Sequence, residues 1–355
     1  MNVFENKSEV GALAPVSLAL GFFDGLHIGH QQLIARCRED AGRSGRACAV
    51  FTFRENPRNV MAGRTVVPRL QTRAEKLAQL EKLGVEYVFD FAFEDGFHTM
   101  PPQAFAQELL AVCFHAEAVF CGFNFRFGKN AAGDADTLIE LGGRFGYGVH
   151  VLDPVRVPTG HDDGHSGVAC HGGGPIGAAC HGDSPSGAVV SPEGVLCAPW
   201  RAGASGPTVS STLIRGLIAE GRIEEANALL GRPYALSGMA VKGNGIGRTL
   251  GFATANFEPD PAMALPALGV YVAETLLDGV PHPSVLNIGK RPTVGGDRVL
   301  VETHLLDLDW ELYDQELTVR FLKMLRAERK FESLQELRDA VAHNKSEAEA
   351  WFAGK

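Results

Sequence analysis

The chain has 355 residues, of which 45% are hydrophobic and 21% charged, proportions typical of a globular protein rather than a disordered or membrane protein. Its formal net charge of -9, from 33 basic and 42 acidic side chains, argues against a nucleic-acid partner, because such binding depends on clustered positive charge. Seven cysteines without a C-x-x-C pair argue against a disulfide framework or a four-cysteine zinc site.

Neither a membrane span nor a secretion signal is expected. No apolar stretch approaches the ~20 residues that a membrane helix needs, and the first stretch of the chain lacks the basic flank of a signal peptide. These features predict a cytoplasmic protein with no membrane partner. Two domains are expected at this length, each large enough to bury its own core.

The two halves of the chain differ in their rhythm. From Val16 to about Val157, strand-like and helix-like stretches alternate, which predicts a parallel sheet in a Rossmann-like α/β fold. From Tyr234 strands follow one another, with Asp278-Gly279 as a hairpin turn, which predicts a small antiparallel β-barrel. The tail from Ser333 has apolar residues at helical spacing and should pack on that barrel as a C-terminal helix.

Residues 158–207 interrupt this pattern. They are rich in Gly, Ala, His, Ser and Pro and contain three similar decapeptides, SGVACHGGGP, IGAACHGDSP and SGAVVSPEGV, which is typical of a flexible insertion. The pairs Cys170-His171 and Cys180-His181 leave a weak metal site open as an alternative. We therefore predict an α/β domain from residues 1–157 and 208–230, an insertion at 158–207, and a barrel domain at 231–355.

The most informative segment is GFFDGLHIGH, residues 21–30, at the end of the first buried strand. His27 and His30 are three residues apart at the expected start of a helix, so both imidazoles should face the same side. Free backbone N–H groups and the positive end of the helix dipole lie beside them, which suits a triphosphate, and Gly29 permits close approach. The alternative is that one histidine only caps the helix or packs.

Two further segments carry groups suited to phosphate binding. Asn124 and Arg126 follow a strand in CGFNFRFG, and SSTLIR places Ser211, Thr212 and Arg215 at a helix N-terminus. Taken singly, each has a structural alternative: a turn, a helix cap or a surface ion pair. The candidate contacts of this first site are Gly21, Phe22, Asp24, His27, Gly29, His30, Asn124, Arg126, Ser211, Thr212 and Arg215.

In these motifs the chain resembles the bacterial bifunctional riboflavin kinase and FAD synthetase family, whose adenylyltransferase module carries GFFDG-x-H-x-GH, G-x-NF-x-FG and SST-x-x-R in this order. The resemblance implies that both histidines are catalytic and that FMN lies across the carboxyl edge of the sheet. A departure is RENPRNV, where Arg54 and Asn56 stand in a stretch that usually contains an acidic residue and a histidine. The implied contacts of ATP and its pyrophosphate are His27, His30, Asn124, Ser211, Thr212 and Arg215.

A second candidate site lies in the glycine-rich loop GNGIGRTLGFATANF. Its glycines allow the backbone to approach phosphates closely, Arg248 adds charge, and Thr254 and Asn256 offer neutral oxygens that suit Mg²⁺. Glycines alone would equally fit a hairpin without a ligand. The candidate ATP contacts are Gly243, Gly245, Gly247, Arg248, Thr249, Gly251, Thr254 and Asn256, and the last two are also the candidate metal ligands.

The family resemblance extends to this half of the chain. The riboflavin kinase module carries G-x-G-x-GRTLGFPTAN, GVY, NIG-x-RPT and V-E-x-HLLD, and this chain has GVY, NIGKRPT and VETHLLD. The resemblance implies that Glu302 is the general base for the ribityl 5'-hydroxyl of riboflavin, and the alternative is a strand carboxylate that faces water. Ala253 replaces the family's proline, and Asp314 replaces a glycine after Tyr313.

The resulting hypothesis is a bifunctional enzyme that phosphorylates riboflavin to FMN and adenylylates FMN to FAD, with ATP as a substrate of both steps and Mg²⁺ as the cofactor. These small molecules would be its partners, and association into a homo-oligomer is left open.

Two rival functions remain to be weighed. A class I aminoacyl-tRNA synthetase is one, because residues 27–30 spell HIGH and KMLRAERK is weakly similar to the second signature of those enzymes; the strand context of Lys323 and the acidic charge argue against it. The other is a single-function nucleotidylyltransferase with a non-catalytic flavin-binding barrel, and the presence of Glu302 argues against that.

Overall fold

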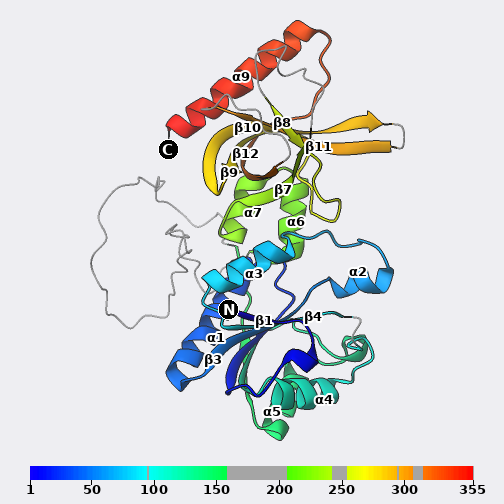
Figure 1. The fold of residues 1–355 in the computed structure, drawn as a ribbon, viewed down its shortest axis with the longest axis vertical. Coiled ribbons are helices and arrows are strands. Elements are labelled where there is room, and N and C mark those ends of the chain that lie inside the picture. The colour runs from blue at the N-terminus through cyan, green and yellow to red at the C-terminus, as the bar shows by residue number, and fades with distance from the viewer. Residues whose placement is uncertain (94–95, 158–205, 242–253, 294–295, 307–314, 355) are drawn as a thin grey trace, which may run out of the picture.

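The structure is a computed structural model that describes residues 1–93, 96–157, 206–241, 254–293, 296–306 and 315–354. Two units follow one another along the long axis of the molecule: an α/β unit that contains the N-terminus and a β-barrel that carries the C-terminal helix (Figure 1). Both predicted architectures are confirmed. Most of the predicted insertion, residues 158–205, lies outside the described residues.

The first unit is built on a six-stranded sheet in the order β1-β4-β3-β2-β5-β6, and every neighbouring pair is parallel. The chain runs outward from β2 through β3 to β4 and then returns to β5 and β6, so the direction of winding reverses between β2 and β5. The strands are β1 (Asn2–Phe4), β2 (Val16–Leu20), β3 (Ala47–Phe53), β4 (Tyr87–Phe91), β5 (Ala116–Gly122) and β6 (Gly148–Leu152).

Helices cover both faces of this sheet, which is why β2 is buried along its whole length. On one face, α1 buries Leu33, Ile34, Cys37 and Ala41, which recur at helical spacing. The other face carries a phenylalanine-rich cluster beneath a π-helix and α5. The helices are α1 (Ile28–Ser44), α2 (Pro57–Ala62), α3 (Arg73–Lys82), α4 (Pro102–Ala104), which continues as the π-helix Phe105–Cys113, and α5 (Ala135–Phe145).

The second unit is a closed barrel in the strand order β10-β11-β8-β7-β12-β9, with antiparallel pairing. Asp278 and Gly279 have φ values of 49° and 80° and form the predicted hairpin turn, since the tightest hairpin turns require positive φ. The strands are β7 (Tyr234–Val241), β8 (Ala255–Phe257), β9 (Gly269–Leu277), β10 (Val280–Thr293), β11 (Gly296–Leu305) and β12 (Glu316–Ala327), and the predicted final helix is α9 (Leu334–Ala353).

Two short helices, α6 (Ser211–Ala219) and α7 (Ile223–Leu230), lie between the sheet and the barrel (Figure 1). Their buried side chains share one apolar cluster with the barrel interior, and that cluster also contains Ile28 and Leu70 of the first unit. The helices therefore pack against both units, and the domain boundary at residues 230/231 stays a prediction.

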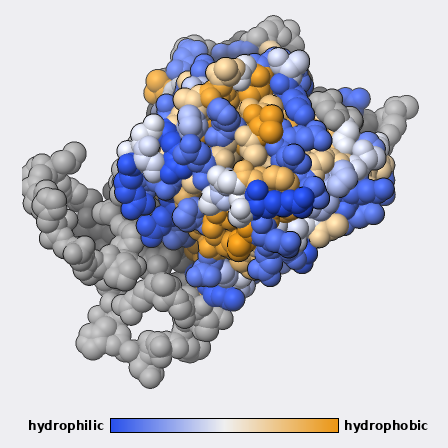
Figure 2. All heavy atoms as spheres, turned by 90° about the horizontal axis from the view of Figure 1, so that it is seen from below, coloured by the Kyte–Doolittle hydropathy of each residue, from blue (hydrophilic) through white to orange (hydrophobic). Residues whose placement is uncertain are grey.

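Three elements were not expected from the sequence. β1 adds a sixth strand to the sheet, and α2 follows β3 where Asn56 caps its first turn. The helical stretch that begins at Pro102 is a π-helix over most of its length. Among the described residues no helix is both long enough and apolar enough to cross a membrane. Figure 2 views the molecule from below, and small apolar patches interrupt a largely polar surface there.

Phe114→Ala should destabilise the first unit more than a nearby substitution on the surface. The ring of Phe114 is fully buried and stacks on Phe89 at 4.0 Å between centroids. We expect the free energy of unfolding to fall by about 3–5 kcal/mol, because a large cavity is left in a close-packed core. Val112, which is 70% exposed, is the control. Val112→Ala should change the free energy of unfolding by less than about 0.5 kcal/mol. Urea unfolding followed by circular dichroism measures both, and equal shifts would contradict the assignment of this core.

Candidate active sites

A cavity of about 460 Å³ lies at the carboxyl edge of the parallel sheet, where β2, β5 and β6 end. Open α/β sheets bind ligands at this edge, where the winding reverses. All of the sequence-predicted contacts of the first site line it except Asp24 and Arg215. The predicted residues that line it are Gly21, Phe22, His27, Gly29, His30, Asn124, Arg126, Ser211 and Thr212.

The two histidines stack on one another, with ring centroids 3.6 Å apart and planes inclined by 16°. His27 is the N-cap of α1, and its Nδ1 accepts a hydrogen bond from the backbone N–H of His30 at 3.3 Å. The predicted shared face is therefore correct, and His27 both caps the helix and lines the cavity. Since Nδ1 is the acceptor, a neutral His27 carries its proton on Nε2.

Both imidazoles are neutral at physiological pH. Burial lowers the pKa of His27 from 6.5 to about 4, and the charge of Arg232 adds to the decrease. Burial, with the neighbouring His27, lowers the pKa of His30 well below its ordinary value. The His30 Nδ1 atom is buried and has no hydrogen-bond partner among the described residues. The pair can thus offer hydrogen bonds to a ligand but not a full positive charge.

Two helix N-termini face the cavity and supply partial positive charge in place of protonated histidines. α1 contributes Gly29 and His30, and α6 contributes Ser211 and Thr212, with Ser210 as its N-cap. The unpaired N–H groups and the dipole at such termini favour an anion. Arg126 adds a guanidinium at the rim; its side chain is 59% exposed and pairs with Asp134 at 3.2 Å.

Asp24 and Arg215 bind each other rather than line the cavity. Arg215 donates to the carboxylate of Asp24 and, through Nε, to the carbonyl of Pro68 at 2.7 Å. The other oxygen of Asp24 accepts from the N–H of Leu70 at 2.9 Å. These contacts fasten the turn between β2 and α1 to α6 and to the segment before α3.

The departures at Arg54 and Asn56 have structural roles in this chain. Arg54 donates to the carbonyl of Asp90 at 3.1 Å and to the carbonyl of Glu5 at 2.8 Å, so it ties the N-terminal segment to the sheet. Asn56 caps α2, where its side chain accepts from the N–H of Arg58. Neither residue is among those lining the cavity.

Sequence reasoning missed the aromatic wall of the cavity. Several phenylalanines line it, and they come from β3, from the segment after β5 and from the π-helix. The signal was present, since FTF and GFNF each follow or end a predicted strand. These residues are Phe51, Phe53, Phe105, Phe123 and Phe125.

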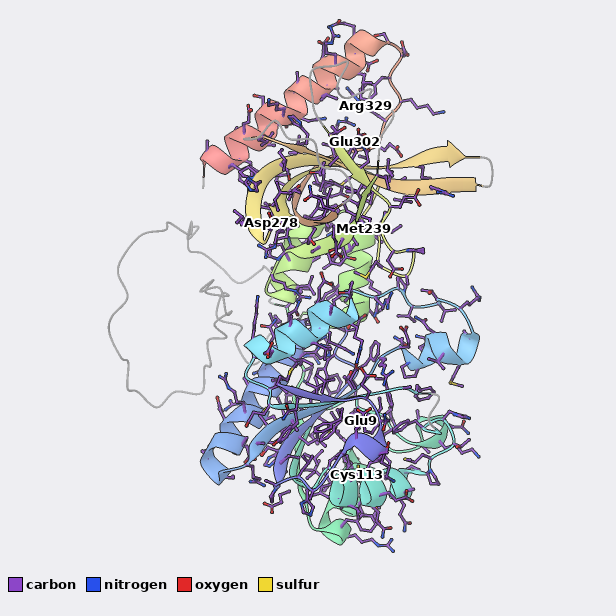
Figure 3. All side chains as sticks on the ribbon, viewed as in Figure 1. Glu9, Cys113, Met239, Asp278, Glu302 and Arg329 are labelled. Carbon is purple, nitrogen blue, oxygen red and sulfur yellow. The ribbon has the colours of Figure 1, made fainter. Side chains whose placement is uncertain are left out.

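A second candidate site lies where β8 runs beside β11 of the barrel. Glu302 is opposite Asn256 in the strand register, and the Thr254 hydroxyl donates to the Glu302 carboxylate at 2.8 Å. Asn256 is 2% exposed, and its Oδ1 atom has no hydrogen-bond partner among the described residues. Figure 3 labels Glu302 on this part of the barrel. The three predicted polar residues are thus brought together.

The rest of the predicted kinase loop lies outside the described residues. This applies to Gly243, Gly245, Gly247, Arg248, Thr249, Gly251, Ala253, Tyr313 and Asp314, as well as to the Cys-His pairs of the insertion. Within the described part of the chain, no group of three or more His, Cys, Asp or Glu side chains could hold a metal ion.

Comparisons with known proteins agree with this division of the chain. The sequence matches the family described as FAD synthetase over residues 11–161 and the family described as riboflavin kinase over residues 230–352. It is 31% identical over 339 residues to the bifunctional riboflavin kinase/FMN adenylyltransferase of Listeria monocytogenes, covering 95% of this chain and 92% of that protein. The Escherichia coli protein of the same name is 32% identical over 336 residues, covering 94% of this chain and 92% of that protein.

A solved structure described as a macrolide-efflux protein from Streptococcus pneumoniae has the same fold, with a TM-score of 0.75 at 25% identity over 98% of both chains. The match of one family to the α/β half of the chain and of the other to the barrel half defines an ATP-using flavin transferase. The chain belongs to the bifunctional riboflavin kinase/FMN adenylyltransferase family. It phosphorylates riboflavin to FMN and adenylylates FMN to FAD with release of pyrophosphate.

The buried, neutral His27 should make the first unit lose stability in acid. The pKa of His27 is lowered from 6.5 to about 4 in the folded protein, so between these pH values the unfolded chain binds a proton that the folded chain does not. The free energy of unfolding therefore keeps its full value above pH 6.5 and decreases as the pH falls from 6.5 to about 4. We expect a loss of up to about 3 kcal/mol from this group. Urea unfolding at pH 7 and at pH 5 measures this loss. Between these two pH values the free energy of unfolding should decrease less in His27→Gln than in the unaltered protein. Parallel decreases in the two proteins would contradict a neutral His27.

Proposed function

We propose that the two reactions use two separate sites: the sheet-edge cavity for adenylylation of FMN and the Thr254-Asn256-Glu302 cluster for phosphorylation of riboflavin. The observation that carries the first assignment is the convergence of three distant sequence motifs on one cavity. The second assignment rests on the hydrogen bond between Thr254 and Glu302.

In the proposed adenylylation, the triphosphate of ATP lies at the N-termini of α1 and α6. The phosphate of FMN attacks the α-phosphorus of ATP, the bond to the bridging oxygen breaks, and pyrophosphate leaves. His27 would donate a hydrogen bond from Nε2 to the transferring phosphoryl group, and the ring of His30 stacks on that of His27. Catalysis would come from alignment and from fixed dipoles rather than from a covalent intermediate.

The aromatic wall of the cavity gives the flavin a place in this proposal. The isoalloxazine ring is flat and largely apolar, and Phe53, Phe105 and Phe125 line the same cavity as the two helix N-termini. Ring contacts of this kind combine apolar burial with a preferred stacking geometry. The flavin would therefore lie on the phenylalanines, and its phosphate would point towards the helix termini.

In the proposed kinase reaction, Glu302 accepts the proton of the ribityl 5'-hydroxyl as that oxygen attacks the γ-phosphorus of ATP and ADP leaves. The hydrogen bond from Thr254 holds the carboxylate in place. A positioned base contributes about 10²- to 10⁴-fold to such a step. The glycine-rich residues before Thr254 would hold the phosphates.

Enzymes of this class use ATP, typically with a divalent metal ion, and we propose Mg²⁺ for this chain. The buried, unpartnered Oδ1 of Asn256 and the hydroxyl of Thr254 are the hard oxygen donors that this ion prefers, and Mg²⁺ commonly takes few protein ligands together with substrate phosphates. When bound, it would neutralise charge on the phosphates of ATP. The same residues would hold it next to Glu302.

A cytoplasmic location is part of the proposal. The cysteines in the described part of the chain, Cys37, Cys48, Cys113 and Cys121, are all free thiols. Free thiols are typical of a reducing compartment.

Glu302→Gln should slow the phosphorylation of riboflavin strongly and leave the adenylylation of FMN unchanged. We expect the kcat for FMN formation to fall by about 10²- to 10⁴-fold, because an amide cannot accept the hydroxyl proton, while adenylylation of supplied FMN keeps its rate. Glu316→Gln, an exposed carboxylate on barrel strand β12, is the matched control. Chromatography of riboflavin, FMN and FAD over time measures both steps. Retained FMN formation in Glu302→Gln would overturn the assignment of the base.

His30→Ala should have the opposite effect. Adenylylation of FMN should slow by about 10²- to 10³-fold, the range found when one preorganised polar group is removed from a transition state, while riboflavin phosphorylation continues. His343→Ala on α9 provides the control, since its side chain is 74% exposed. The same chromatographic assay applies. An unchanged rate of FAD formation in His30→Ala would show that the adenylylation site lies elsewhere.

A further inference from the structure

The turn between β2 and α1 is held by its carbonyl groups. Five consecutive carbonyls, from Phe22 to Leu26, each accept a hydrogen bond from a side chain of a different part of the chain. In chain order the donors are Thr52 at 2.8 Å, Gln71 at 2.9 Å, Ser211 at 2.9 Å, Arg232 at 2.7 Å and Gln31 at 2.8 Å.

The backbone of this turn is strained. Phe23 and Leu26 have φ values of 54° and 40°, and Gly25 between them has 82°. Residues with a Cβ atom adopt this region only under strain, and they stay there when the surroundings fix the conformation. The five donors are such surroundings. Gly25 is also closely packed, because a Cβ atom there would lie 2.8 Å from Leu70.

One of the five donors, Arg232, comes from the segment that leads into the barrel. Arg232 stands between α7 and β7, inside the stretch that matches the riboflavin kinase family. Its guanidinium donates to the carbonyl of Gly25 and also to Gln71 Oε1 at 3.0 Å, and the amide of Gln71 in turn holds the carbonyl of Phe23. A single side chain thus fixes two of the strained peptides.

The fixed peptide lies two residues before His27, the N-cap that orients the start of α1. A rotation of the Gly25 peptide would change the direction in which the chain enters the helix, and His27 and Gly29 would move with it. Displacements of about 1 Å in such groups reduce rates by about 100-fold. The positions of His27 and Gly29 in the first site therefore depend on the conformation of the turn.

We propose that Arg232 is a positioning residue for the adenylylation of FMN, so that the residue which completes the turn of the first unit is supplied from the barrel side of the chain. The inference rests on the proposed position of the ATP site around His27 and His30. It makes adenylylation dependent on the link between the two units, although Arg232 itself does not line the cavity.

Arg232 is not needed to keep the units together. Arg69 pairs with Asp260, its N–H donates to the carbonyl of Ala262 at 2.7 Å, and its carbonyl accepts from the N–H of Ala264 at 2.8 Å. These contacts join the first unit to the barrel independently of the turn. Loss of the Arg232 guanidinium should thus loosen the turn and leave the two units docked.

The test compares Arg232→Gln and Arg232→Lys in the full-length enzyme, with the two reactions assayed separately. For Arg232→Gln we expect the kcat of FMN adenylylation to fall by about 10- to 100-fold, with smaller changes in the KM values for ATP and FMN. Riboflavin phosphorylation in the same preparation should be unchanged. Arg232→Lys should recover part of the lost rate, because an ammonium can donate to Gly25 but lacks the planar fork that also reaches Gln71.

Arg222→Gln is the matched control. Arg222 is the N-cap residue of α7, its side chain is 53% exposed, and it pairs with the neighbouring Glu220 and Glu225, so its loss should change neither reaction. If Arg232→Gln cannot be purified folded, Arg232→Lys decides alone, with an intact kinase reaction and a reduced adenylylation kcat as the expected result.

Two results would overturn the proposal: wild-type adenylylation in Arg232→Gln, or equal losses of both reactions, which would mean a purely structural role. His30→Ala, assayed beside these variants, separates this failure from a wrong site. A slowed His30→Ala with a wild-type Arg232→Gln rejects only the role of Arg232. A wild-type His30→Ala rejects the position of the site itself.

Discussion

The turn that leads from β2 into α1 is the constraint on which the first site depends. It must bring two histidines to the mouth of the cavity at the start of a helix, and it does so with a backbone that Phe23 and Leu26 adopt only under strain. Its carbonyls are therefore occupied by side chains from the sheet, from α1, from the segment before α3, from α6 and from the start of the barrel.

This arrangement gives the SSTLIR motif a double role. Ser210 caps α6, so the N-terminus of that helix faces the cavity, while Ser211 holds the carbonyl of Asp24. Arg215, one turn further along, binds the Asp24 carboxylate. Such a charged pair at a partly buried position costs desolvation, which its several hydrogen bonds offset. The motif therefore both lines the cavity and holds the turn that carries the histidines.

The sequence was sufficient to predict the groups that act locally. His27 and His30 share a face because of helical spacing, whereas Thr254, Asn256 and Glu302 were named from separate motifs, and the pairing of β8 with β11 that brings them together was not predicted. What could not be predicted depends on contacts between distant segments. The hydrogen bonds of Arg54 to Glu5 and Asp90, the pairing of β1 with β4, and the contact between Arg232 and Gly25 each join parts of the chain that carry no local signal for one another.

The two proposed sites face different chemical demands, and the residues proposed for each site suit them. Riboflavin offers a hydroxyl that must lose its proton to attack, so the barrel needs a base, and Glu302 lies beside the hydroxyl of Thr254. FMN offers a phosphate whose second pKa is about 6, so it is already an anion at neutral pH and needs no base. The first site can accordingly keep its histidines neutral and bind its carboxylate, Asp24, to Arg215. Its task is to bring two anions together, for which helix N-termini and fixed hydrogen bonds are enough only if the turn that carries them does not move.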